Sequence, residues 1–477
     1  MNVLLIEPPE PPPPVAPSEP PGGDTQLFAP RWSLLCLRAY LLKHTRHLCE
    51  LVDCRFFHNF EEDLIQTVRR FPETGMAVVN TSSLSLGQTA AVFDVIKRHF
   101  PHIRTAICGQ HPSQFPEHVS TIPRMDFALA GDPEPVLRNL LDYLDVEQRL
   151  RRVPGLIIPG TRMDKPYWLP DLKSLTLPDW QGIFWRSYRV GTDEGTCRAI
   201  IRLSRGHTQC AMDRAFGDSH EPLRFWPLDR LVSAIQKCGH LGVTELYMAD
   251  PPGLWTPENL HQWCGALVYG RNVQPWSLRL FPCALHPDTI EAMKNALCRR
   301  VDFVFPSCDA KVLREYGCTA SLRDVAQTLL ALENEGIGVH TRFWIGGPEE
   351  SHGEKERVIR TIRAMKFRPY SLHAFPFNLD SPLYRDYHEA SSTRVDDWVE
   401  WARDPWIVQR PVALWGGANA ASQRIQDFEA IQKAVHRHPR RVLGKLLQDL
   451  HTRNLFAILE SKLMGNWPHA LSKEKRE

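Results

Sequence analysis

Short apolar runs alternate with amphipathic stretches along most of this 477-residue chain, and this alternation is the feature that most constrains its fold. The runs are rich in β-branched residues, are too short for buried helices, and end in polar or glycine-containing turns. Strands that alternate with helices form parallel sheets that helices cover on both faces. The sequence therefore predicts an α/β protein, and the alternation occurs in two separate series.

The first series occupies residues 1–146 and contains five strands. Apolar runs predict strands at 3–6, 47–54, 76–79, 103–108 and 127–130. Helical spacing predicts helices at 33–45, with Ser33 as N-cap, and at 61–71, 89–100 and 136–144. This order suits a flavodoxin-like doubly wound domain, in which ligands bind beyond the carboxyl ends of the strands.

The second series occupies residues 196–385 and predicts a partial (β/α)6 barrel, with its chemistry at the carboxyl ends of the strands. Strands are predicted at 198–204, 243–249, 276–281, 302–306, 338–346 and 371–376. Helices are predicted at 228–238, 256–268, 287–296, 309–316, 321–335 and 354–365. A proline-containing linker, 147–195, is expected to make an ordered, extended crossing between the two domains. A helical C-terminal region, 386–477, forms either a cap on the barrel or a lid that contacts substrate.

Composition narrows the class of protein further. Apolar residues make up 43% of the chain and charged residues 23%, and the net charge of +2 gives no reason to expect a nucleic-acid partner. The sequence contains neither a run of about 18 apolar residues nor a basic N-terminal signal, so a cytoplasmic protein without a membrane span is expected. Its twelve cysteines lack paired spacing, which favours reduced thiols. The proline-rich stretch 8–21 predicts an extended surface loop or a polyproline ligand for a partner.

Polar and glycine-containing segments follow the predicted strands of the first series at 7–9, 82–85, 109–113 and 131–134. The stretches VVNTSSLS, AICGQHPSQFPEHV and DFALAGDPEPVLRNLL, which contain the last three segments, resemble the cobalamin (B12)-binding domain that precedes many radical S-adenosylmethionine (SAM) domains. The last two resemble Gly-Gly-x-His-Pro and Gly-Glu-x-Glu segments of that family, with Cys108 and Asp132 as departures.

This resemblance implies a cobalamin site at the carboxyl ends of the strands. The residues implied are Ser82, Leu84, Ser85, Gly109, Gln110, His111, Pro112, Gly131, Asp132 and Glu134. The Asp-x-His-x-x-Gly pattern that supplies a cobalt ligand in another class of cobalamin domains is absent. His111 is therefore expected near the corrin rather than on cobalt, or else it shapes a turn with Pro112.

An apolar run at 199–203 breaks at Ser204-Arg205-Gly206 and leads into a polar loop that contains Cys210. This stretch resembles the start of a radical SAM domain, as do LYMADPPG, CRRVDFVFPSCDAKVL and GIGVHTRFWIGGPEES further along the chain. The last segment implies contacts between SAM and Gly346, Gly347 and Pro348.

The cysteines that define the radical SAM family are mostly missing. Three thiolates spaced Cys-x3-Cys-x2-Cys hold the [4Fe-4S] cluster in that family, and thiolate is the soft anionic ligand that the cluster needs. With Cys210 first, second or third, the other two positions are Arg214 and Gly217, Gly206 and Asp213, or Leu203 and His207. Each register supplies one thiolate. His207, Cys210 and Asp213, at intervals of three, are an alternative metal site with mixed ligands.

Three functions follow from these patterns. The resemblance implies a cobalamin-dependent radical-SAM-like enzyme with a degenerate iron–sulfur site, and methyl transfer to, or remodelling of, a small metabolite as its reaction. Cobalamin is the expected cofactor, whereas SAM and a [4Fe-4S] cluster are cofactors of the family. A non-catalytic relative that binds cobalamin or a partner enzyme is the second reading. A metal-dependent enzyme that uses His207, Cys210 and Asp213 is the third.

Overall fold

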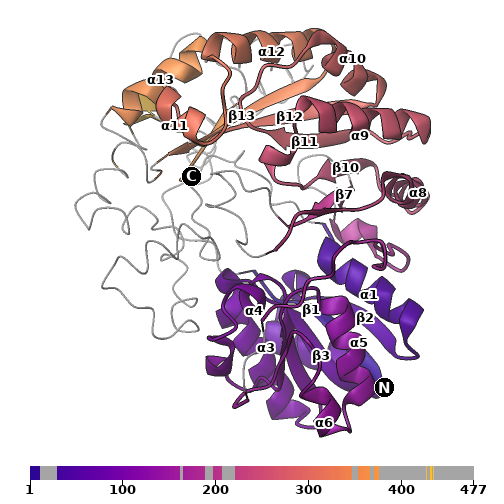
Figure 1. Cartoon of the computed structure of the whole chain (residues 1–477). Coiled ribbons are helices and arrows are strands. Elements are labelled where there is room, and N and C mark those ends of the chain that lie inside the picture. Colours follow the sequence, from indigo (N-terminus) through magenta and orange to yellow (C-terminus); the bar gives the residue numbers. More distant parts are fainter. Residues whose placement is uncertain are drawn as a thin grey trace, which may run out of the picture.

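The structure is a computed structural model of the chain, and it contains two α/β domains joined by a linker (Figure 1). It describes residues 1–10, 29–161, 165–188, 197–206, 221–345, 347, 353–365 and 370–374, together with a few positions between 426 and 434. Each domain is built on a six-stranded sheet, and both predicted architectures are confirmed. Among the described helices, none has the length and hydropathy that a bilayer crossing requires.

The sheet of the first domain has the strand order β2-β1-β3-β4-β5-β6. Its strands are β1 (Asn2–Glu7), β2 (Leu48–Asp53), β3 (Thr74–Asn80), β4 (Arg104–Cys108), β5 (Phe127–Leu129) and β6 (Leu156–Ile157). Strands β1 to β5 are parallel, whereas β6, which the sequence did not predict, pairs antiparallel with β5. The strand order reverses between β1 and β3, where ligands bind in doubly wound sheets.

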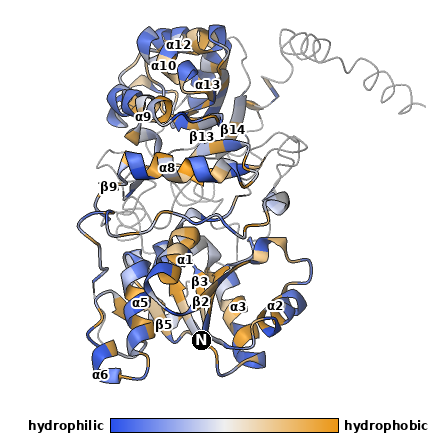
Figure 2. Ribbon diagram, turned by 90° about the vertical axis from the view of Figure 1, so that its right-hand side faces the viewer, coloured by the Kyte–Doolittle hydropathy of each residue, from blue (hydrophilic) through white to orange (hydrophobic). Residues whose placement is uncertain are grey.

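Helices cover both faces of this sheet. They are α1 (Trp32–His44), α2 (Phe60–Arg69), α3 (Leu86–His99), α4 (Gln110–Gln114), α5 (Pro133–Tyr143) and α6 (Glu147–Leu150). Alternate residues of β1 point to opposite faces, so Leu4 packs in a cluster with α2 and α3, and Leu5 packs in a second cluster with α1 and α5. Every residue of β1 is buried, and Figure 2 shows the apolar strands between the helices.

The second sheet has the order β14-β13-β12-β11-β10-β7 and is parallel throughout. Its strands are β7 (Arg198–Ile201), β10 (Glu245–Met248), β11 (Trp276–Leu280), β12 (Cys298–Phe305), β13 (Gly338–Ile345) and β14 (Tyr370–Ala374). Its helices are α8 (Leu228–Gly239), α9 (Pro257–Tyr269), α10 (Pro287–Asn295), α11 (Ala310–Glu315), α12 (Leu322–Asn334) and α13 (Glu354–Ala364). Strands that neighbour one another in chain order make the predicted partial barrel.

Several local predictions differ from the structure. Ser33 is not the N-cap of α1, because the helix begins at Trp32 and Arg31 precedes it without a side-chain cap. Helix α5 begins at Pro133, three residues earlier than predicted, since proline suits the first helical turn. The antiparallel hairpin of β8 (Ser204–Arg205) and β9 (Arg224–Phe225) was not predicted. The proline-rich stretch and nearly all of the predicted C-terminal helical region lie outside the described residues.

The linker is fixed to both domains by hydrogen bonds. Arg38 of α1 donates to the carbonyl of Gln181 at 3.0 Å, and the Tyr188 hydroxyl donates to Asp53 at 2.8 Å. On the barrel side, Arg230 of α8 donates to the carbonyl of Lys173 at 2.7 Å. The two domains and the linker therefore form one continuous structure.

Candidate functional site

The carboxyl ends of β3 and β4 form a polar edge beside the point where the strand order reverses. The backbone N–H of Ser82 donates to the hydroxyl of Ser85 at 2.9 Å, which fixes the short 3-10 turn before α3. Across the edge, the hydroxyl of Ser83 and Nδ1 of His111 lie 2.8 Å apart and share a hydrogen bond. Two loops from different strands are thereby joined into one surface.

His111 is fully buried in this edge, and its ring lies 5.5 Å from that of Phe115. Burial lowers the pKa of His111 to about 3, so the imidazole is neutral at physiological pH. Pro112, beside it, is also buried. Burial and the bond to Ser83 favour the interpretation that His111 shapes the turn.

Gly109 is required by the backbone around it. Its φ of +107° belongs to a region that residues with a side chain rarely adopt. A Cβ at this position would lie 2.8 Å from the carbonyl oxygen of Thr81 and 2.9 Å from Oδ1 of Asn80. We expected a bulky residue here to block a corrin, but the protein itself already excludes one.

The part of this edge that solvent can reach is small. Ser82, Ser85 and Gly109 are half-buried, and Gln110 is exposed. Leu84 lies in the same turn (Ser83–Ser85), and its side chain is outside the description. Among the predicted residues whose side chains are described, these four are the ones that a bound cofactor can touch without displacing the protein.

Asp132 and Glu134, predicted to contact cobalamin, instead bind arginines of the protein. They are 1% and 0% exposed, respectively. Arg205 donates to both carboxylates, at 3.1 Å to Asp132 and 3.0 Å to Glu134, and Arg224 donates to Asp132. A signal for Arg205 was present in the sequence, in the Ser-Arg-Gly stretch, whereas nothing in the sequence singled out Arg224.

Gly131 also faces the protein rather than an open edge. It forms a β-bridge with Tyr167 of the linker, and a Cβ on Gly131 would lie 2.1 Å from the Tyr167 carbonyl oxygen. The linker therefore covers the β5 part of the edge, and the β3–β4 part remains accessible.

Asp250, which follows β10, fixes the turn after β7. Its carboxylate accepts hydrogen bonds from the backbone N–H groups of Leu203 and Ser204 and from the Ser204 hydroxyl, at 2.8–3.0 Å. Asp250 is 4% exposed, and this burial raises the pKa of its carboxyl group. Sequence reasoning had noted the segment around it but not this residue.

The predicted metal ligands His207, Cys210 and Asp213 lie outside the described residues, as do Gly346 and Pro348. Gly347 is described and is buried just beyond β13. Within the described ranges, no group of three His, Cys, Asp or Glu side chains is arranged to hold a metal ion, and no disulfide joins the cysteines there.

Other cysteines were considered as ligands for the loop after β7. Cys197 lies at the amino end of β7, the far end from that loop, and its thiol donates to the Trp185 carbonyl at 3.4 Å. It cannot supply a thiolate to the loop. Cys283 follows β11, and burial raises the pKa of its thiol to about 12, which disfavours the thiolate form.

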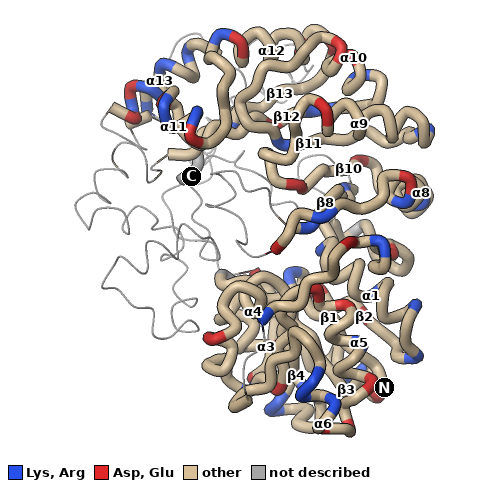
Figure 3. The backbone as a smooth tube through the Cα atoms, in the orientation of Figure 1, with Lys and Arg blue, Asp and Glu red and all other residues tan. Residues whose placement is uncertain are grey.

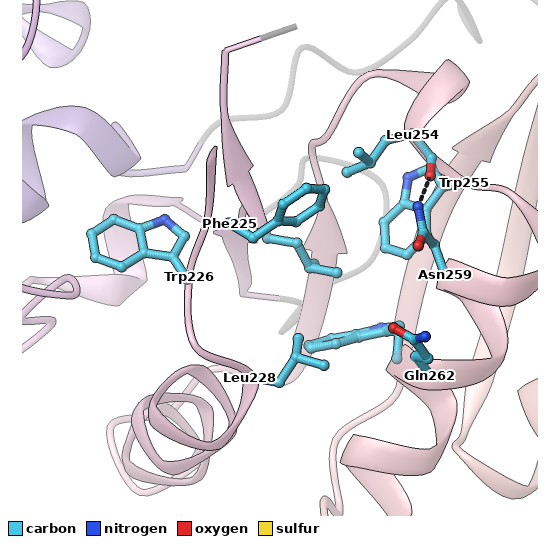
Figure 4. A pocket seen from close by; sticks show the side chains of 9 residues that line it. Phe225, Trp226, Leu228, Leu254, Trp255, Asn259 and Gln262 are labelled. Atoms are coloured by element: carbon cyan, nitrogen blue, oxygen red, sulfur yellow. Dashed lines mark hydrogen bonds between the residues drawn. The ribbon is translucent and has the colours of Figure 1, made fainter. Parts of the chain in front are cut away.

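A separate apolar pocket of about 140 Å³ lies between the β8–β9 hairpin and helix α9 (Figure 4). Phe225, Leu254, Trp255 and Trp263 line it, and Asn259 at its rim donates to the Leu254 carbonyl at 2.7 Å. Sites for drug-sized ligands and cofactors usually measure about 300–1,000 Å³. The pocket is therefore too small for cobalamin or SAM, and it contains none of the predicted site residues.

Comparison with known proteins extends the picture beyond the local geometry. No protein-family model matches the chain, and no curated protein matches its sequence. Among solved structures, the radical SAM methyltransferase TsrM from Kitasatospora setae, with tryptophan substrate and a SAM analogue bound, matches with a TM-score of 0.62 and 15% identity. The match covers 89% of this chain and 82% of TsrM.

A second solved structure, the cobalamin-dependent SAM radical enzyme OxsB with aqua-cobalamin and SAM bound, matches with a TM-score of 0.57 and 14% identity. That match covers 91% of this chain and 61% of OxsB. At such identities the likeness concerns the fold. The two sheets, their order along the chain and their linker give this protein the fold of the cobalamin-dependent radical SAM enzymes.

Proposed function

We propose that this protein binds cobalamin at the accessible edge formed by Ser82, Ser85, Gly109 and Gln110, and that it is a cobalamin-dependent radical-SAM-like enzyme. Its expected reaction is methyl transfer to, or remodelling of, a small metabolite. The observation that carries the proposal is a polar edge at the strand reversal of a doubly wound domain, in a fold that matches TsrM over 89% of the chain.

The residues of the edge suit a large, flat ligand with polar side groups. The hydroxyls of Ser82 and Ser85 and the amide of Gln110 supply hydrogen-bond donors and acceptors. Gly109 has no side chain to keep a ring away from the backbone. Cobalamin, when bound, supplies a cobalt centre that carries a methyl group. The neutral, buried His111 would support the edge from below.

Binding can be tested by titrating the full chain with hydroxocobalamin and following the corrin absorbance. We expect one corrin per chain and about tenfold weaker binding in Gln110→Trp, because the indole would occupy the exposed part of the edge. Gln66→Trp, on an exposed position of α2, is the matched control and should bind normally. Absence of uptake by the wild type would overturn the proposal.

We further propose that the protein does not hold a SAM-cleaving [4Fe-4S] cluster. Cys210 supplies one thiolate where the spacing needs three, and Cys197 is at the wrong end of its strand. Anaerobic reconstitution with iron and sulfide should give less than a four-iron cluster, and reduction should release no 5′-deoxyadenosine. A full cluster in the wild type that is lost in Cys210→Ala would show that the loop is a working cluster site.

A non-catalytic relative is the second candidate, and the same loss of thiolates favours it. Such a protein would bind hydroxocobalamin at the same edge and show no turnover of SAM or methylcobalamin with any small-molecule acceptor. A stable complex with a second enzyme in pull-downs from the source cells would then distinguish a scaffold from a catalyst.

A further inference from the structure

The β8–β9 hairpin holds the two ends of the 207–220 loop together. Arg205 in β8 and Arg224 in β9 are paired directly opposite each other. Gly206, which follows Arg205, has a φ of +86°, and a Cβ there would lie 2.2 Å from the Pro222 carbonyl oxygen. The chain therefore leaves and re-enters the barrel domain at one narrow base, which lies between the two domains in Figure 3.

Both arginines of this base reach out of the barrel domain into the first domain. They bind Asp132 and Glu134 at the carboxyl end of β5, where Glu134 uses both of its oxygens for Arg205. The four side chains are between 0% and 11% exposed. We refer to Arg205, Arg224, Asp132 and Glu134 as the interdomain ion-pair cluster.

Aromatic rings and the linker complete the surroundings of the interdomain ion-pair cluster. The guanidinium of Arg205 lies over the ring of Trp226 and that of Arg224 over the ring of Trp168, each at 5.6 Å. Arg224 also donates to the Leu169 carbonyl at 2.9 Å, and the Leu169 N–H donates to Asp132 at 2.8 Å. Each arginine is thus held in one position by charge, ring face and backbone.

We propose that Arg205 and Arg224 are positioning residues that fix the hairpin base over the carboxyl edge of the first sheet, so that ligand binding at this edge depends on them. The geometry supports this because Asp132 and Glu134 follow β5, next to the β3–β4 edge, in the same sheet. The cluster is independent of the proposed cobalamin function, whereas its effect on cobalamin affinity rests on that function.

A second buried ion pair provides a matched control. Arg198 at the start of β7 donates to Glu245 at the start of β10 at 2.8 Å, and the Glu245 side chain is 4% exposed. This pair lies at the amino end of the barrel strands, away from the hairpin. Glu245→Gln therefore removes a charge of the same kind without touching the interdomain ion-pair cluster.

Hydrogen exchange of the full chain without ligand tests the positioning role directly. In Glu134→Gln we expect exchange at residues 203–206 and 221–226 to become at least about tenfold faster, because the variant loses one ionic partner of Arg205. In Glu245→Gln the same peptides should keep the wild-type rate. Unchanged exchange in Glu134→Gln would overturn the proposal.

A second variant covers the case in which Glu134→Gln does not fold. Arg205→Lys keeps the charge but loses the fork that binds both Glu134 oxygens, so it should give the same faster exchange on a smaller scale. Exchange at wild-type rates in a folded Arg205→Lys would also count against a positioning role.

Titration with hydroxocobalamin tests the link to ligand binding. We expect Glu134→Gln to bind about tenfold more weakly than the wild type, and Glu245→Gln to bind equally well. If the wild type takes up no cobalamin, the proposed function is wrong, and the exchange result still decides the positioning role. If Glu134→Gln shows faster exchange but unchanged affinity, the dependence of ligand binding on the cluster is wrong.

Discussion

At the residue scale, Gly109 separates the needs of the fold from those of a ligand. Its backbone conformation is open almost solely to glycine, and a Cβ would press on the Thr81 carbonyl. We expect Gly109→Ala to lower the free energy of unfolding by about 3 kcal/mol, from strain plus steric overlap. Urea unfolding measures this loss.

Gly160→Ala is the control for this substitution. Gly160 also has a positive φ, +78°, but a Cβ there would meet no atom within 4 Å. Its loss should stay near the roughly 1–2 kcal/mol that a left-handed conformation costs a residue with a side chain. Equal losses at the two positions would show that the contact with Thr81 is unimportant.

His111 predicts a dependence of stability on pH. Burial holds its pKa at about 3, below its usual value near 6.5, so between these values the unfolded chain binds a proton that the folded protein does not. The stability that the neutral imidazole provides is complete above about pH 6.5 and is lost as the pH falls. From pH 7.5 to 5.5 this one group should remove about 1.4 kcal/mol.

Urea unfolding at the two pH values, with His111→Asn alongside, measures this contribution. The variant should lose stability less steeply on acidification than the wild type, whatever its stability at pH 7.5. His58→Gln, at an exposed position, should keep the wild-type slope. A wild-type slope in His111→Asn would contradict the assignment.

At the element scale, the sequence predicted those parts of the fold that repeat a pattern. Strand β1 was predicted because its apolar run is continuous, as a strand buried on both faces must be. The start of α1 was missed because no side chain caps it. The two-residue strands β8 and β9 were missed because so short a pairing leaves no periodic signal.

The candidate site shows the same limit. Its position at the carboxyl ends of the strands could be predicted, because parallel topology alone brings those ends together. The partners of Asp132 and Glu134 could not be predicted, since Arg205 is 71 positions beyond Glu134 in the chain and Arg224 is 92 positions beyond Asp132. Only the docking of the two domains brings these charges together.

Asp250 gives a prediction about the turn after β7. An amide in its place would turn an N–H group toward the N–H groups of Leu203 and Ser204, so Asp250→Asn should cost about 1–3 kcal/mol. Hydrogen exchange at these two residues should become faster. Asp171→Asn, in an exposed turn where the carboxylate accepts from the Lys173 N–H, is the control and should leave them unchanged. Equal exchange in both variants would refute a role for Asp250.

At the scale of the whole molecule, tryptophans join the two domains through the linker. Trp32 of α1 contacts Trp180 of the linker and Trp226 beyond β9, with ring centroids 6.0 and 6.5 Å apart. All three are buried in the cluster that also forms the barrel core. The domains are therefore expected to unfold together.

Trp180→Ala should uncouple them. Truncation of a buried tryptophan costs about 3–5 kcal/mol, and here the loss falls on the contact between domains. Calorimetry should show one heat-absorption peak for the wild type and two for Trp180→Ala. Trp263→Ala, which removes a fully buried tryptophan from the barrel, should lower the melting temperature without splitting the peak. A single peak in Trp180→Ala would argue against cooperative domains.

The antiparallel strand β6 has a consequence for producing the first domain on its own. Residues 156–157 pair with β5, and Tyr167 bridges to Gly131, so the sheet is completed by chain that follows residue 146. A fragment that stops at 146 would leave the β5 edge bare, and bare edges recruit strands from other molecules. Such a fragment should precipitate during expression, whereas one extended to residue 170 would carry its own protective border.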